Sequence, residues 1–104
     1  MDIKELMEQA KKMQEDLGNI EQELQETIYE GNNGGEGGVT IKINGRFEMQ
    51  ECIIAEELYE AGDREMLQDM ILIAQNEAVN KANQDRADKM GQATEGLDIE
   101  LPEL

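Results

Sequence analysis

The positively charged side chains of this chain are few and gather in three places. The chain has 9 basic and 25 acidic residues, and its formal net charge is -16. A field of this sign repels polyanions at long range. Basic side chains on acidic helices most often form salt bridges with neighbouring carboxylates. The three locally positive places are Lys11 with Lys12, Lys42 with Arg46, and the group of Lys81, Arg86 and Lys89.

Residue types that support catalysis or metal binding are scarce. The sequence has no histidine, which removes the usual general base, the Ser-His and Cys-His nucleophile pairs and most transition-metal sites. The carboxylates lack the spacing of a calcium-binding loop. The glycine run that begins at Gly31 has no GxxxxGK[ST] pattern, and a predicted strand follows it instead of a helix. We therefore expect a protein that is not an enzyme and that has no cofactor and no metal.

Length and composition indicate a single domain, residues 1–104, with a modest core. A chain of 104 residues commonly gains stability by association. The one cysteine, Cys52, excludes an internal disulfide and suits a reducing compartment. No segment resembles a signal peptide or an apolar run long enough to span a bilayer. We expect a cytoplasmic protein with no membrane partner.

Residues 27–54 are predicted to hold the strands. The β-branched and aromatic residues at 27–29 suggest a short first strand. Five of the eight residues from Gly31 to Gly38 are glycine, which predicts a mobile loop that connects strands. The apolar residues that follow alternate with polar ones, as in a strand with one buried face: Val39, Ile41 and Ile43.

The pair Asn44-Gly45 predicts a hairpin after this strand. A two-residue loop would set Ile43 opposite Arg46, whereas a three-residue loop with a bulge sets Ile43 opposite Phe47. We favour the bulged turn, because it aligns apolar side chains. The continuous apolar run at residues 52–54 predicts that both faces of this strand end are covered.

The first helix, at about residues 1–26, carries a heptad stripe. Asp2 is its predicted N-cap. The stripe is either a coiled-coil seam or the face with which the helix covers its own sheet, and both roles are compatible. Because the helix is longer than a small sheet, part of the stripe is expected to seek another chain. The stripe consists of Ile3, Leu6, Ala10, Met13, Leu17, Ile20 and Leu24.

A turn of helix over residues 55–61 and a second long helix, at about 63–92, are predicted next. Asp63 is the expected N-cap of the long helix. Leu72 and Ile73 make its first half apolar nearly all round, which favours a shared core. Beyond Ala78 it turns polar and is expected to project into solvent. The acidic tail, residues 93–104, is expected to be flexible. The predicted buried face is Met66, Leu67, Met70, Ile71, Ala74, Ala78 and Ala82.

In this order, four segments of the chain resemble the YbaB/EbfC family of bacterial nucleoid-associated proteins. They are the amphipathic KKMQEDL segment, the loop and hairpin EGNNGGEGGVTIKINGRFEM, the helix EMLQDMILIAQNEAVNKA and the segment MGQATEGL. The resemblance covers nearly the full length and is specific only when the four are taken together. The family's structural glycines and turn correspond here to Gly34, Gly35, Gly37, Gly38, Asn44 and Gly45.

The resemblance implies an α+β fold with an α-β-β-β-α protomer. A small antiparallel three-stranded sheet would lie between two long helices, and two protomers would form a two-fold dimer with projecting helices. It also implies binding of duplex DNA with little sequence preference, in nucleoid organisation or gene regulation. The DNA-binding candidates are Lys11, Lys12, Lys42, Arg46, Lys81, Arg86 and Lys89. The dimer-core candidates are Leu17, Ile20, Leu24, Ile41, Ile43, Phe47, Ile53, Leu67, Met70 and Ile71.

The strong negative charge supports an alternative of another class. The same dimeric fold would serve as an acidic module that binds a protein partner, for instance by imitating DNA, and would not bind DNA itself. The resemblance favours DNA binding, and the charge of -16 favours the interaction module.

Overall fold

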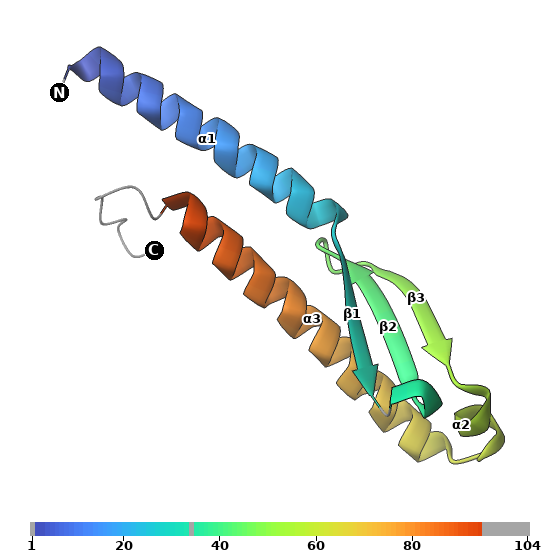
Figure 1. Ribbon diagram of the computed structural model, residues 1–104. Coiled ribbons are helices and arrows are strands. Elements are labelled where there is room, and N and C mark those ends of the chain that lie inside the picture. Colours follow the sequence, from blue (N-terminus) through green and yellow to red (C-terminus); the bar gives the residue numbers. More distant parts are fainter. Residues whose placement is uncertain (1, 34, 95–104) are drawn as a thin grey trace.

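The computed structural model of this chain describes residues 2–33 and 35–94 (Figure 1). The order of elements confirms the predicted α+β fold with one antiparallel sheet. The elements are α1 (Ile3–Glu26), β1 (Ile28–Asn33), the 3-10 turn η1 (Gly35–Gly37), β2 (Val39–Asn44), β3 (Met49–Ile54), α2 (Glu56–Glu60) and α3 (Arg64–Thr94).

Both long helices begin at the aspartates that the sequence indicates. The Asp2 side chain accepts a hydrogen bond from the Lys4 backbone N–H at 3.3 Å. Asp63 Oδ1 accepts one from the Met66 backbone N–H at 3.1 Å. Each bond satisfies a donor that has no partner within the helix. Gly62, with a φ of +70°, makes the turn between α2 and α3.

The sheet has the order β1-β2-β3, and α3 lies across β1 and β2 (Figure 1). All six residues of β3 are exposed. The expectation that residues 52–54 are covered on both faces is therefore wrong for the protomer, because the helix that covers the sheet stops short of its third strand. In chain order the sheet lies between the two long helices, but in space only α3 covers it.

Small residues let α3 approach the sheet closely. Ala74 and Ala78 are fully buried and belong to the same core as β2, in which Val39, Ile41 and Ile43 have no exposed surface. A Cβ atom on Gly31 would overlap the carbonyl oxygen of Ala74. Only glycine fits at this point of β1.

The predicted mobile loop is shorter than expected. The segment Gly31–Asn33 forms the end of β1 and pairs with β2, so the prediction of a mobile loop from Gly31 onward is wrong for these residues. The Asn32 side-chain amide donates to Thr40 Oγ1 at 2.6 Å, and its carbonyl accepts from the Gly35 N–H at 2.9 Å. Position 34 lies outside the described residues. The strand continues because the pairing and the contact with α3 outweigh the flexibility of glycine.

The hairpin loop between β2 and β3 has three residues, as predicted, but it is displaced by one position. The Asn44 N–H donates to the Glu48 carbonyl and the Phe47 N–H donates to the Asn44 carbonyl, both at 3.0 Å. Phe47 has a φ of +64°. In this register Ile43 lies opposite Met49, so the expected pairing of Ile43 with Phe47 is wrong.

The Asn44 side chain explains the displacement. Its Oδ1 accepts hydrogen bonds from the backbone N–H groups of Arg46 at 2.9 Å and Glu48 at 3.1 Å. Such Asx bonds specify a turn locally. They place the turn after Asn44. A register shift between Lys42 and Ile43 lets the remaining residues of β2 and β3 pair with one another despite the displaced turn.

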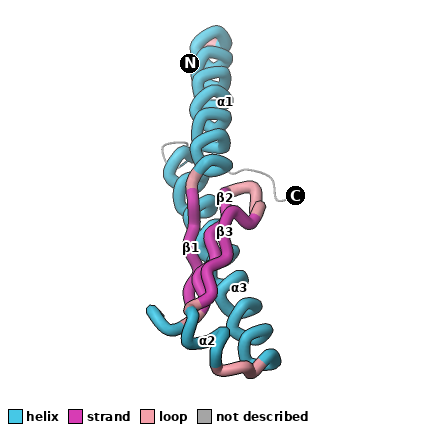
Figure 2. The backbone as a smooth tube through the Cα atoms, turned by 90° about the vertical axis from the view of Figure 1, so that its right-hand side faces the viewer, coloured by secondary structure: helices cyan, strands magenta, loops and turns pink. Residues whose placement is uncertain are grey.

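A body and an arm can be distinguished in the protomer (Figures 1 and 2). We define the body as the sheet with residues 64–81 of α3, and the arm as α1 with residues 82–94 of α3. The two helices of the arm are antiparallel, and α1 does not cover the sheet. Exposure along the α1 stripe falls from 74% at Ile3 to 1% at Leu24.

The second half of α3 extends beyond the sheet with one face exposed, as expected, but its other face packs against α1 and β1 (Figure 1). Ala82 is 3% exposed, and Asp85 and Arg86 form hydrogen bonds to β1 and α1. The helix ends at Thr94. The expected flexibility of the acidic tail concerns residues 95–104, which lie outside the described residues, and residues 93–94, which are helical.

Candidate nucleic-acid interface

The Arg86 side chain joins the two helices of the arm. Its guanidinium forms an ion pair with the Glu21 carboxylate of α1 and donates to the Gly45 carbonyl at 3.5 Å. The hydrogen bond between the two side chains lowers the pKa of Glu21 and raises the pKa of Arg86. An arginine that is engaged in this way has less freedom to bind a phosphate.

A second polar contact joins β1 to the arm. The Tyr29 hydroxyl donates to Asp85 Oδ2 at 2.6 Å, and Lys89 Nζ lies 3.1 Å from the same oxygen. Burial, followed by the hydrogen bond to Asp85, raises the pKa of Tyr29 to about 12. The bond from Tyr29 lowers the pKa of Asp85. Lys89 therefore belongs to a network within the protomer.

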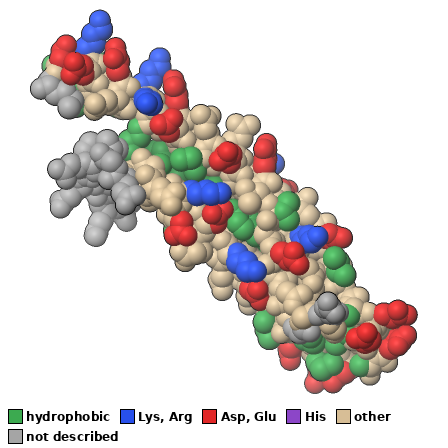
Figure 3. All heavy atoms as spheres, viewed as in Figure 1, with side chains coloured by type: hydrophobic (Ala, Val, Ile, Leu, Met, Phe, Trp, Pro, Cys, Tyr) green, Lys and Arg blue, Asp and Glu red, His purple; other side chains and the backbone are tan. Residues whose placement is uncertain are grey.

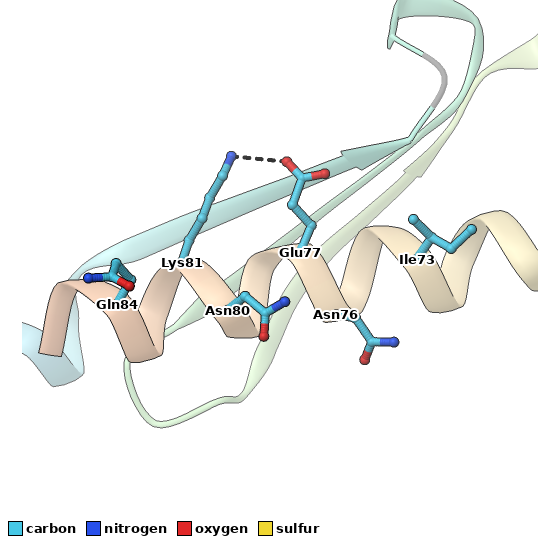
Figure 4. A pocket seen from close by; sticks show the side chains of 6 residues that line it. All are labelled: Ile73, Asn76, Glu77, Asn80, Lys81 and Gln84. Atoms are coloured by element: carbon cyan, nitrogen blue, oxygen red, sulfur yellow. Dashed lines mark ion pairs between the residues drawn. The ribbon is translucent and has the colours of Figure 1, made fainter. Parts of the chain in front are cut away.

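Lys81 lies beside a shallow groove on α3 (Figure 4). Its Nζ donates to the Glu30 backbone carbonyl at 2.7 Å and lies 3.2 Å from Glu77 Oε1. Asn76 and Asn80 point away from this ion pair. The residues that line the groove are Ile73, Asn76, Glu77, Asn80, Lys81 and Gln84.

The carboxamides of this groove are candidate phosphate ligands that the sequence analysis missed. Asn and Gln side chains contribute to phosphate and sugar contacts in protein–DNA complexes. Their spacing in the sequence could have indicated them. Asn76, Asn80 and Gln84 recur every fourth residue and so share one face of a helix.

The two candidates on the hairpin differ in their contacts. Lys42 Nζ lies 3.5 Å from Glu51 Oε2 on the neighbouring strand. Arg46 donates through Nε to the Gln25 side-chain oxygen at 3.4 Å. Within the described residues, Arg46 has no carboxylate within 4.0 Å.

Lys11 and Lys12 are exposed on α1, and among residues 2–33 and 35–94 neither has a carboxylate within 4.0 Å. The seven predicted candidates therefore do not form one patch. Figure 3 shows basic side chains separated from one another by acidic ones on the face in view. Four candidates are paired with carboxylates, and three have no carboxylate partner among the residues that the structure describes, namely Lys11, Lys12 and Arg46.

The predicted dimer-core residues fall into three classes of exposure. Leu24, Ile41 and Ile43 are buried inside the protomer, at 1%, 0% and 0%. Phe47 and Ile53 remain 43% and 44% exposed. The others are partly buried, namely Leu17, Ile20, Leu67, Met70 and Ile71.

The described part of the chain has no helix that is long and apolar enough to cross a membrane. It also has no group of three side chains able to hold a metal ion.

The chain matches the YbaB/EbfC DNA-binding family over residues 1–97. It is 41% identical to a nucleoid-associated protein of Chloroflexus aurantiacus over 97 residues, which cover 93% of this chain and 96% of the relative. It is 39% identical to a nucleoid-associated protein of Clostridium novyi, covering 95% and 86% of the two chains.

The fold also resembles the crystal structure of an uncharacterized protein from Helicobacter pylori. The TM-score is 0.67 at 26% identity, and the alignment covers 85% of this chain and 91% of that one. The sequence resemblance, the order of helices and strands and these matches agree. The chain belongs to the YbaB/EbfC DNA-binding family.

Proposed function

We propose that this protein is a homodimeric nucleoid-associated protein that binds duplex DNA with little sequence preference. The observation that carries the proposal is family membership over residues 1–97. Relatives that align over nearly their whole length are named nucleoid-associated proteins. The protein would act in the bacterial cytoplasm, on the nucleoid.

Two exposed apolar surfaces, one on β3 and one on the first half of α3, support the homodimer. The unpaired edge of β3 and the first half of α3 expose large apolar side chains, which a soluble protomer rarely leaves in contact with water. A second copy would cover them around a two-fold axis. The exposed side chains are Met49 at 50%, Ile53 at 44%, Ile54 at 38%, Met66 at 41%, Leu72 at 61% and Ile73 at 53%.

Sedimentation equilibrium tests the dimer. Wild-type protein should sediment as a dimer at micromolar concentration, and Ile73→Asp should dissociate it, because an unpaired charge in an interface is unfavourable. Met7→Asp is the matched control, since Met7 is a similarly exposed apolar residue, at 68%, on the distant half of α1. A folded wild-type monomer, or equal dissociation of both variants, would contradict this interface.

The candidate cations without a carboxylate partner in the described part of the chain are the proposed DNA contacts. Lys11 and Lys12 lie on the arm and Arg46 lies on the hairpin loop, and two-fold symmetry doubles each. Contacts to phosphates position a protein without reading its sequence, so affinity should depend strongly on salt and weakly on sequence. With about 3 to 6 phosphate contacts, the logarithm of the binding constant should fall with a slope of about -0.9 per contact against the logarithm of salt concentration.

A salt titration on duplex DNA from about 20 to 200 mM tests these contacts. Lys11→Gln with Lys12→Gln should weaken binding and flatten the slope by about 1 for each lysine that meets a phosphate. Lys81→Gln with Lys89→Gln is the matched control, because it removes the same charge from side chains that are paired within the protomer. An equal effect of both variants would show that net charge alone matters.

The acidic interaction module remains the second candidate. It is favoured by the charge of -16 and by the four carboxylate-bound cations. It predicts no complex with DNA at any salt concentration, so the absence of binding by wild type at the lowest salt would favour it.

A further inference from the structure

The hairpin loop between β2 and β3 lies beside the end of α1 that continues into β1 (Figures 1 and 2). A Cβ atom on Gly45, in this loop, would overlap the backbone carbonyl oxygen of Leu24. The φ angle of Gly45 lies outside the left-handed region, so the turn itself does not require glycine at this position. The close approach of α1 requires it.

Two arginines add polar contacts at the same point. Arg46 follows Gly45 in the loop and donates through Nε to the Gln25 side-chain oxygen at 3.4 Å. Arg86 of α3 donates to the Gly45 carbonyl at 3.5 Å and forms an ion pair with Glu21. The last two turns of α1, the hairpin loop and α3 therefore meet at one place.

The loop is held in shape by bonds that do not involve α1. Asn44 Oδ1 accepts from the backbone N–H groups of Arg46 and Glu48, and Asn44 Nδ2 donates to Glu48 Oε1 at 2.9 Å. The Phe47 N–H donates to the Asn44 carbonyl at 3.0 Å. Because side-chain and backbone bonds both fix its conformation locally, the loop can act as a stop for the helix that touches it.

The connection between α1 and β1 is short enough to serve as a pivot. Thr27 is the single residue between the two elements, and its backbone is extended, with φ -70° and ψ 138°. At about 1.5 Å per residue, Leu24 lies about 4.5 Å and Ile3 about 36 Å from Thr27 along the helix axis. A tilt that displaces α1 at Leu24 is therefore amplified about eightfold at its outer end.

We propose that the hairpin loop sets the direction of α1. The helix acts as a lever that pivots at Thr27, and the contact of Gly45 with the Leu24 carbonyl determines where its outer end lies. The partly buried residues between α1 and α3 then hold the helix in that direction. One consequence, that the loop also places Lys11 and Lys12 relative to DNA, rests on the proposed function.

Distances between two spin labels, measured by pulsed electron paramagnetic resonance, test the proposal on the full chain. Cys52 is replaced by serine, and labels are attached at Glu8→Cys on α1 and Gln92→Cys on α3, which are both exposed positions. The labelled protein is refolded with an excess of unlabelled protein, so that the measured distances lie within one chain.

Gly45→Ala should change this distance by about 5 Å or more, because the loop and the Leu24 carbonyl must separate by about 1 Å and the lever amplifies that movement. Gly18→Ala is the matched control. It makes the same substitution within α1, where the added Cβ would meet no atom of residues 2–33 or 35–94 within 4 Å, and it should leave the distance unchanged. An unchanged distance in Gly45→Ala, or an equal change in both variants, would overturn the proposal.

Asn44→Ala supplies a second variant that keeps the proposal testable if Gly45→Ala does not fold. The hydrogen bonds of the Asn44 side chain stay within the loop, so their loss can affect α1 only through the loop. The distribution of distances should broaden at least about twofold. Thr40→Ala is the control, because it removes a side-chain hydrogen bond, from Asn32, at the other end of β2.

A distribution in Asn44→Ala as narrow as that of wild type would overturn the proposal, and so would equal broadening in Thr40→Ala. Neither measurement contains DNA, so the failure of this proposal is distinguishable from the failure of the proposed function.

Discussion

The body and the arm of this protomer are held together by different interactions. In the body, β-branched side chains of β2 and alanines of α3 are fully buried, and a glycine of β1 meets the helix backbone. In the arm, an ion pair between partly exposed side chains joins α1 to α3, and the apolar residues are partly buried or exposed except for Leu24 and Ala82, which lie next to the body. The stability of the body therefore depends on close packing, whereas the contact between the helices of the arm depends on charge.

The largest effect is expected from filling the space in the body. Gly31→Ala should destabilise the protein by about 3 kcal/mol or more, because the added Cβ overlaps the Ala74 carbonyl oxygen and the backbone must move. Urea unfolding followed by circular dichroism measures the change. A loss below about 1 kcal/mol would mean that α3 can withdraw from β1, and that the body is less tightly packed than described.

The next largest effect is expected at the junction between the body and the arm. Tyr29→Phe removes the hydrogen bond to Asp85 and should cost about 1.5 kcal/mol at neutral pH. Because the native state raises the pKa of Tyr29 to about 12, above the usual value of about 10, this stabilisation is present below about pH 10. It should be lost as the pH rises from about 10 to about 12.

Urea unfolding of wild type and Tyr29→Phe across this pH range checks the prediction, and the two curves should converge at the alkaline end. Tyr59→Phe is the control, since Tyr59 is 74% exposed and should show no such convergence. A difference between wild type and Tyr29→Phe that is independent of pH would refute the role of the hydroxyl proton.

A smaller effect is expected within the arm. A double-mutant cycle of Glu21→Gln and Arg86→Gln should yield a coupling of about 1 kcal/mol, as both side chains are about one-third exposed. The lowered pKa of Glu21 means that this coupling is present above its usual pKa and is lost as the pH falls through its native value. A coupling that persists after Glu21 is protonated would indicate that packing, and not charge, joins the helices.

The smallest effect is expected from replacing two helix glycines, which, in contrast to Gly31, have space beside them. A Cβ added at Gly18 of α1 or Gly91 of α3 would meet no atom of residues 2–33 or 35–94 within 4 Å. Alanine at either position should stabilise the protein by about 0.5 kcal/mol, because a helix interior favours alanine over glycine. Destabilisation by either change would reveal a close neighbour in the arm, such as the segment beyond Thr94 or a second chain.

Several features were predictable because they depend on neighbours in sequence. The helix starts at Asp2 and Asp63, the alternating strand at residues 39–43 and the three-residue hairpin loop all follow from local hydrogen bonds and periodicity. The register of the hairpin was missed by one residue, because the side chain of Asn44 competed with the alignment of apolar residues. The extension of β1 through Gly31 was missed because its cause, the backbone of Ala74, lies far away in the sequence.

The sequence by itself determined the elements, their order and the family, since caps, periodicity and turn residues act over a few positions. The ion pairs of Lys81 with Glu77 and of Lys89 with Asp85 are spaced by four residues on one helix, so local spacing encodes them as well. Only the tertiary structure decided that Arg86 is engaged, because its partner Glu21 lies on α1, 65 residues away along the chain. Such a pair depends on a distance of a few ångströms between remote segments, and no local pattern encodes it.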